Sequence, residues 1–215
     1  MSKMRNSLIM ILFLSNHSLR AQPRPGLEML YCPDGRPLWS ALSTKLSYET
    51  VKGNYFELRR NYEQDGTIAC SAGRSFSGTG LFSWSITPVA GLVAGKSEGL
   101  SLGLNAALAY KKLSFSSCIR QTTSFIRGEP GFLFSWSELG CKLADHLSAG
   151  LVLQQTCCYR NGNTREPGGN ERGPAGEIWE PGGLVAISFG AWTFPLYLFK
   201  SGDEPCSVVA GICYQ

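Results

Sequence analysis

The stretch Leu100–Tyr110 has the sequence LSLGLNAALAY and alternates strictly between two kinds of residue. Successive side chains of a β-strand point to opposite faces, so a period of two places the larger apolar residues on one face. An alternating stretch of this length that ends in an aromatic residue is typical of a tilted membrane-spanning strand, which needs about 9 to 11 residues. The apolar face holds Leu100, Leu102, Leu104, Ala106, Leu108 and Tyr110, and the opposite face holds Ser101, Gly103, Asn105, Ala107 and Ala109.

The same period of two recurs in the segments 54–63, 113–122, 146–159 and 207–215. A soluble sandwich would carry more Lys, Glu and Asp on the solvated face of such strands. The sparse charge within these segments therefore favours a membrane barrel with a small, polar interior. Phe56, Leu58 and Tyr62 oppose Glu57, Arg59 and Asn61; Leu113, Phe115 and Ile119 oppose Ser114, Ser116, Arg120 and Thr122; Leu147, Leu151 and Leu153 oppose Ser148, Gly150, Gln154 and Thr156.

Composition agrees with an all-β membrane protein. The chain has 215 residues, which suits one domain, and only 17% of them are charged, against about 25% in typical soluble domains. The net charge of +4 comes from scattered residues, so no nucleic-acid-binding surface is expected. After Leu14 no apolar run reaches the roughly 18 residues of a membrane-spanning helix. A membrane location therefore requires a closed barrel.

The first residues have the layout of a secretory signal peptide. Lys3 and Arg5 give a positive start, and residues 8–14 (LIMILFL) form a short apolar run. We expect a signal peptide at 1–21, cleaved after Ala21, and hence an exported bacterial protein. A short buried helix is the alternative interpretation of this segment.

The remaining chain divides into two parts. Residues 22–40 contain four prolines and no clear period, which predicts an irregular periplasmic lead-in, and residues 41–215 are expected to form the barrel. We predict nine connections and hence ten antiparallel strands, with 41–63 supplying a single strand; eight strands is the second choice. The segment 160–181 is rich in Gly, Pro, Asn, Arg and Glu, and predicts a long outer loop with a possible extracellular ligand.

These features together resemble small bacterial outer-membrane β-barrel proteins. The signal peptide, the alternating segments and the final strand around Ile212–Tyr214 carry the resemblance, which covers about residues 42–215. It implies a closed up-and-down transmembrane β-barrel in the bacterial outer membrane, in contact with the lipid bilayer and the outer-membrane assembly machinery. Proteins of this class usually end in an aromatic residue, whereas here Gln215 follows Tyr214.

Charged residues on the inward faces are the candidate functional group. The expected roles are structural, loop-presenting or a narrow pore, and we prefer a plug of ion pairs, because an unpaired buried charge is costly and a small barrel leaves little interior room. Arg74 and Glu138 are candidate partners in such a plug. The lumen-lining candidates are Glu57, Arg59, Asn61, Asn105, Arg120 and Gln154.

Other chemistry finds little support in the sequence. The eight cysteines show no C-x-x-C pair, so neither a metal site nor another cofactor is expected, although an export compartment would permit disulfides. His146 follows Asp145 in a predicted turn, and no catalytic residue is predicted. Two alternatives remain: an exported soluble β-barrel or β-sandwich that binds an apolar ligand, and a barrel-borne lipid hydrolase that uses His146.

Overall fold

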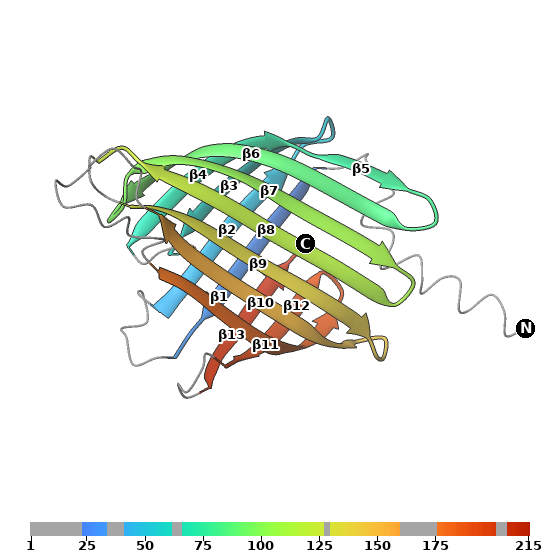
Figure 1. Ribbon diagram of the computed structural model, residues 1–215. Helices are drawn as coiled ribbons and strands as arrows, with labels where there is room; N and C mark the ends of the chain where they lie inside the picture. The colour runs from blue at the N-terminus through green and yellow to red at the C-terminus, as the bar shows by residue number, and fades with distance from the viewer. Residues whose placement is uncertain (1–22, 34–40, 62–65, 127–129, 160–175, 201–205) are drawn as a thin grey trace, which may run out of the picture.

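The chain folds into a β-barrel, shown as a computed structural model in Figure 1. The structure describes residues 23–33, 41–61, 66–126, 130–159, 176–200 and 206–215. The expected signal peptide, 1–21, lies outside these residues. Within them the strands are β1 (Arg24–Tyr31), β2 (Leu42–Glu49), β3 (Asn54–Arg60), β4 (Thr67–Arg74), β5 (Phe76–Thr79), β6 (Ser83–Gly95), β7 (Gly99–Tyr110), β8 (Leu113–Ser124), β9 (Gly131–Lys142), β10 (Leu147–Tyr159), β11 (Gly176–Phe189), β12 (Trp192–Phe199) and β13 (Ser207–Tyr214).

The sheet closes on itself through antiparallel pairs between neighbouring strands. The first strand, β1, pairs with the last, β13, in a register that sets Leu27 opposite Tyr214. A further pairing between β4 and β6 completes the ring and leaves β5 outside it. The described part of the chain is therefore a closed barrel of twelve strands with one extra strand. Closure leaves no free sheet edge around the ring, as a membrane requires.

The extra strand β5 is a continuation of β4. Both pair with β6 in one unbroken register, in which Gly73 lies opposite Val89 and Phe76 opposite Ile86. Pro88 stands between these two partners on β6. Because proline has no N–H to donate, the ladder is interrupted at this point. The extra strand β5 is thus the end of a long β4 that extends beyond β3.

The prediction of an all-β antiparallel barrel is correct, but the prediction of ten strands, with eight as second choice, is wrong. Two segments account for the difference. Residues 24–31, placed in the irregular lead-in, form β1 and pair on both sides. Residues 41–63, assigned one strand, contain β2 and β3, because Gly53 adopts a φ of 80° that allows a tight turn at 50–53.

The connections differ in length at the two ends of the barrel. Both ends of the described chain, together with the turns at 50–53, 80–82, 111–112, 143–146 and 190–191, lie at one end, which we call the short-turn end. Short turns face the periplasm in outer-membrane barrels, so the short-turn end is the periplasmic one. Of the predicted loop 160–181, residues 176–181 belong to β11, so the prediction is wrong for them. Residues 160–175 lie outside the described residues.

The outer surface of the barrel is apolar. Large side chains on its strands are widely exposed, among them Leu102 at 53% and Leu151 at 65%. Exterior aromatic residues gather near the short-turn end, as in the girdle of a membrane barrel. A soluble barrel would instead have a polar exterior and an apolar interior. The girdle residues are Tyr48, Phe76, Trp84, Tyr110, Phe189, Trp192 and Tyr214. Among the described residues no helix is long and apolar enough to cross a membrane.

Candidate functional site in the barrel interior

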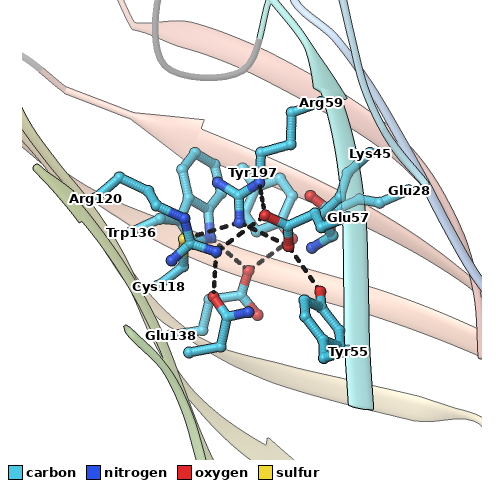
Figure 2. A network of polar contacts seen from close by, with 11 residues as sticks. Glu28, Lys45, Tyr55, Glu57, Arg59, Cys118, Arg120, Trp136, Glu138 and Tyr197 are labelled. Atoms are coloured by element: carbon cyan, nitrogen blue, oxygen red, sulfur yellow. Dashed lines mark hydrogen bonds and ion pairs between the residues drawn. The ribbon is translucent and has the colours of Figure 1, made fainter. Parts of the chain in front are cut away.

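A buried carboxylate, Glu57, is held inside the barrel by two arginines. Strand alternation turns Glu57 and Arg59 of β3 toward the interior, and Arg120 of β8 reaches the same point (Figure 2). Oε1 of Glu57 lies 2.7 Å from Arg59 Nε and 3.0 Å from Arg120 Nη2. Oε2 accepts hydrogen bonds from Arg59 Nη2 at 3.1 Å and from the Tyr55 hydroxyl at 2.7 Å. Three hydrogen bonds, from Tyr55, Arg59 and Arg120, therefore hold the carboxylate, and the close Arg59 Nε adds an ion pair.

Arg120 depends on a glycine for its position. Gly103 of β7 pairs directly with Arg120, and a Cβ atom at Gly103 would lie 2.4 Å from Arg120 Cδ. The arginine therefore lies flat over the spot where another residue would carry a side chain. In this position its Nη2 donates to Asn105 Oδ1 at 2.8 Å and its Nη1 to the Ile119 carbonyl at 2.8 Å.

A second carboxylate, Glu138 of β9, lies in the same region of the interior (Figure 2). Its Oε1 accepts a hydrogen bond from Trp136 Nε1 at 2.7 Å and another from the Tyr197 hydroxyl at 2.8 Å. Trp136 and Tyr197 also belong to a buried apolar cluster that fills the side of the barrel formed by β1 and β9–β12. The cluster contains Leu30, Phe132, Phe134, Trp136, Val152, Leu184, Ala186, Tyr197 and Phe199.

The interior charges in this region balance. Lys45 of β2 pairs with Glu28 of β1 at 2.5 Å, which adds one more charge of each sign to the groups above. We call the set of Figure 2 the central network. It holds three carboxylates and three cations, and it consists of Glu28, Lys45, Tyr55, Glu57, Arg59, Asn105, Cys118, Arg120, Trp136, Glu138 and Tyr197.

The structure brings four of the six sequence-predicted residues together. Glu57, Arg59, Asn105 and Arg120 are all in the central network. Asn61 instead lies at the turn after β3, with a φ of 51°; its Oδ1 accepts from Gly66 N at 2.8 Å and its Nδ2 donates to the Leu42 carbonyl.

The sixth candidate, Gln154, lies opposite Trp136 of the network, but its Nε2 donates to Glu180 Oε2 at 2.8 Å instead. Of the two further charged residues named from the sequence, Glu138 joins the network. Arg74 does not: it is exposed near the short-turn end and packs against the Phe76 ring at 5.9 Å.

Sequence reasoning missed several members of the central network. Tyr55 shares the face of Glu57 by the period of two and could have been found from that signal. Glu28 and Lys45 lie in the two segments whose strands were not recognised. Trp136 and Tyr197 were missed because an apolar interior wall has no distinct pattern when the exterior is apolar as well.

The cysteines and the histidine are separate from this site, except for Cys118, whose Sγ accepts a hydrogen bond from Arg59 Nη2 at 3.2 Å. Among the described residues the cysteines form no disulfide. No group of three potential metal ligands lies together in the described part of the chain. His146 lies in the turn before β10, where its Nδ1 is 3.0 Å from the Ser188 carbonyl oxygen and its ring stacks on Phe189.

Comparison with known proteins supports the fold. No protein-family model matches the chain, and no curated protein matches it in sequence. The solved structures that are similar to the chain include the KdgM porin in complex with disordered oligogalacturonate, with 12% identity and a TM-score of 0.54 over 89% of this chain and 98% of that one. They also include the NanC porin, with 9% identity and a TM-score of 0.57 over 89% of this chain and 100% of that one. The predicted resemblance to outer-membrane β-barrel proteins is thereby confirmed at the level of fold, and a closed barrel with this apolar exterior belongs in the outer membrane.

Proposed function

We propose that this barrel is closed at its centre and does not conduct solutes at rest, so that its role is structural and loop-presenting. The observation that supports the proposal is the burial of the central ion pairs. The side chains of Glu57, Arg59 and Arg120 are only 1–2% exposed, although ionised groups in a water-filled pore would remain hydrated. The apolar cluster on the opposite wall leaves that side of the interior unfavourable for polar solutes as well.

The charge balance of the interior is a second argument. The similar KdgM structure holds oligogalacturonate, an anionic chain that positive charge would attract. In the present barrel each arginine of the central network is within 3.0 Å of the Glu57 carboxylate. Because the three cations of the central network are matched by three carboxylates, we do not carry an anionic sugar over to this protein.

The experiment is a conductance measurement in planar bilayers with the purified full-length protein. The wild type should insert without producing stable current steps. The triple variant Glu57→Ala/Arg59→Ala/Arg120→Ala removes both arginines together with the carboxylate that pairs with them, and it should conduct.

Lys112→Ala, in the β7–β8 turn, is the matched control and should remain silent. A heat-modifiable gel shift checks that each variant is folded. Steady, open-pore conductance by the wild type would overturn the proposal and favour a narrow pore.

A further inference from the structure

A notch interrupts the barrel wall at the short-turn end. β3 begins at Asn54, which lies opposite Arg74, whereas β4 continues beyond that point as β5. The β2–β3 turn fits into the resulting gap, because the Ser75 amide donates to the Gly53 carbonyl at 2.7 Å. A cavity of about 360 Å³ lies at this place. The charged and aromatic residues that line it are Arg24, Glu49, Lys52, Arg74, Phe76 and Trp84.

The notch has an excess of positive charge. Arg24, Lys52 and Arg74 line it together with a single carboxylate, Glu49, so two positive charges are uncompensated. Within the described residues no ion pair is recorded for any of the three cations. The contact recorded for Arg74 is with the Phe76 ring. This differs from the balanced central network and indicates an anionic ligand.

Two aromatic residues in the walls of the notch indicate its depth in the membrane. Phe76 and Trp84 are exterior residues, 49% and 39% exposed, and belong to the aromatic girdle. Aromatic rings of a girdle lie at the level of the lipid headgroups. The cavity therefore adjoins the layer of the leaflet that contains phosphate, and the guanidinium groups are suited to hydrogen-bond phosphate oxygens in pairs.

We propose that the notch binds the phosphate of an anionic phospholipid from the leaflet on the short-turn side. The two uncompensated positive charges favour a lipid with a net negative charge over a zwitterionic one. Phe76 and Trp84 provide the apolar contact for the glycerol and upper acyl region of the same molecule. A soluble phosphate ion would use the three cations but would gain nothing from the two rings.

The test uses native mass spectrometry of the full-length protein in detergent micelles. The probes are phosphatidylglycerol, phosphatidylcholine and inorganic phosphate, each titrated separately. We expect one phosphatidylglycerol molecule to be retained preferentially, and Arg24→Gln/Arg74→Gln to weaken its retention about tenfold or more, since two charge-assisted contacts are lost. Lys112→Gln removes one charge at the same end of the barrel but outside the notch, and should leave retention unchanged.

Two further measurements make the outcome decisive. Phe76→Ala/Trp84→Ala should weaken retention of the lipid while leaving any binding of inorganic phosphate unaltered. The gel shift confirms that every variant is folded. Equal retention of the two lipids, an unchanged titration in Arg24→Gln/Arg74→Gln, or binding of inorganic phosphate that phosphatidylglycerol does not displace would each overturn the proposal.

Discussion

The substitution Glu57→Gln tests the reasoning about the barrel interior most directly. Glutamine keeps the shape of the side chain but removes the counter-charge of Arg59 and Arg120, whose nitrogens lie 2.7 and 3.0 Å from Oε1. The other carboxylates of the central network have recorded partners of their own, Lys45 for Glu28 and the Trp136 and Tyr197 donors for Glu138. The two arginines therefore stay buried without compensation.

The expected loss of stability is large. Removing one partner of a buried ion pair costs about 3–5 kcal/mol, which is at least about a hundredfold in the folding equilibrium. The measurement is reversible urea unfolding in detergent, followed by tryptophan fluorescence. Glu98→Gln, at an exposed turn, is the matched control and should change the free energy of unfolding by less than about 0.5 kcal/mol.

A third variant separates charge from packing. Glu57→Gln/Arg59→Gln/Arg120→Gln removes all three charges, so it should recover part of the stability that the single substitution loses. If Glu57→Gln unfolds within about 1 kcal/mol of the wild type, smaller than any buried-pair penalty, the interior must be hydrated. The closed-barrel argument would then fail.

Three further substitutions probe other parts of the barrel. Gly103→Val should displace Arg120, which lies over this position, and lower the heat-modification temperature. An unchanged temperature would show that Arg120 does not need the space above Gly103. Leu104→Arg places a charge on the apolar exterior and should cost about 2–4 kcal/mol if it lies near the bilayer midplane, whereas Leu143→Arg in the β9–β10 turn should cost little; equal costs would argue against this membrane placement. Tyr197→Phe should cost about 1 kcal/mol in urea unfolding through the lost hydrogen bond to Glu138, and a gain in stability would contradict that bond.

The period of two was enough to predict the class of fold and most of the strands. Leu100–Tyr110 alternates as expected, and β7 spans Gly99–Tyr110. The segment 24–31, which was wrongly predicted to be irregular, does alternate, since Leu27, Met29 and Tyr31 share one face and Glu28 lies on the other. The four prolines of 22–40 hid this pattern, yet only Pro25 lies within the strand, next to the first residue of β1, where a missing N–H is tolerated.

The candidate site was only partly predictable for a different reason. Alternation shows which residues face inward, but it does not show which inward residues meet across the barrel. Asn105 and Arg120 come together because β7 and β8 pair in a particular register. Asn61 also follows the alternation of its segment, but the chain turns at that residue, so its amide binds backbone groups instead.

The seam between β1 and β13 has a consequence for how the protein reaches its final state. Leu27 and Tyr214 are separated by almost the whole chain, yet they face each other across this seam. Every other junction of the ring joins strands that are near neighbours in sequence and can form locally. Until β13 pairs with β1, both edges of the open sheet expose unpaired backbone N–H and C=O groups, which can pair with other chains. The ring therefore closes only after the whole polypeptide has been translocated.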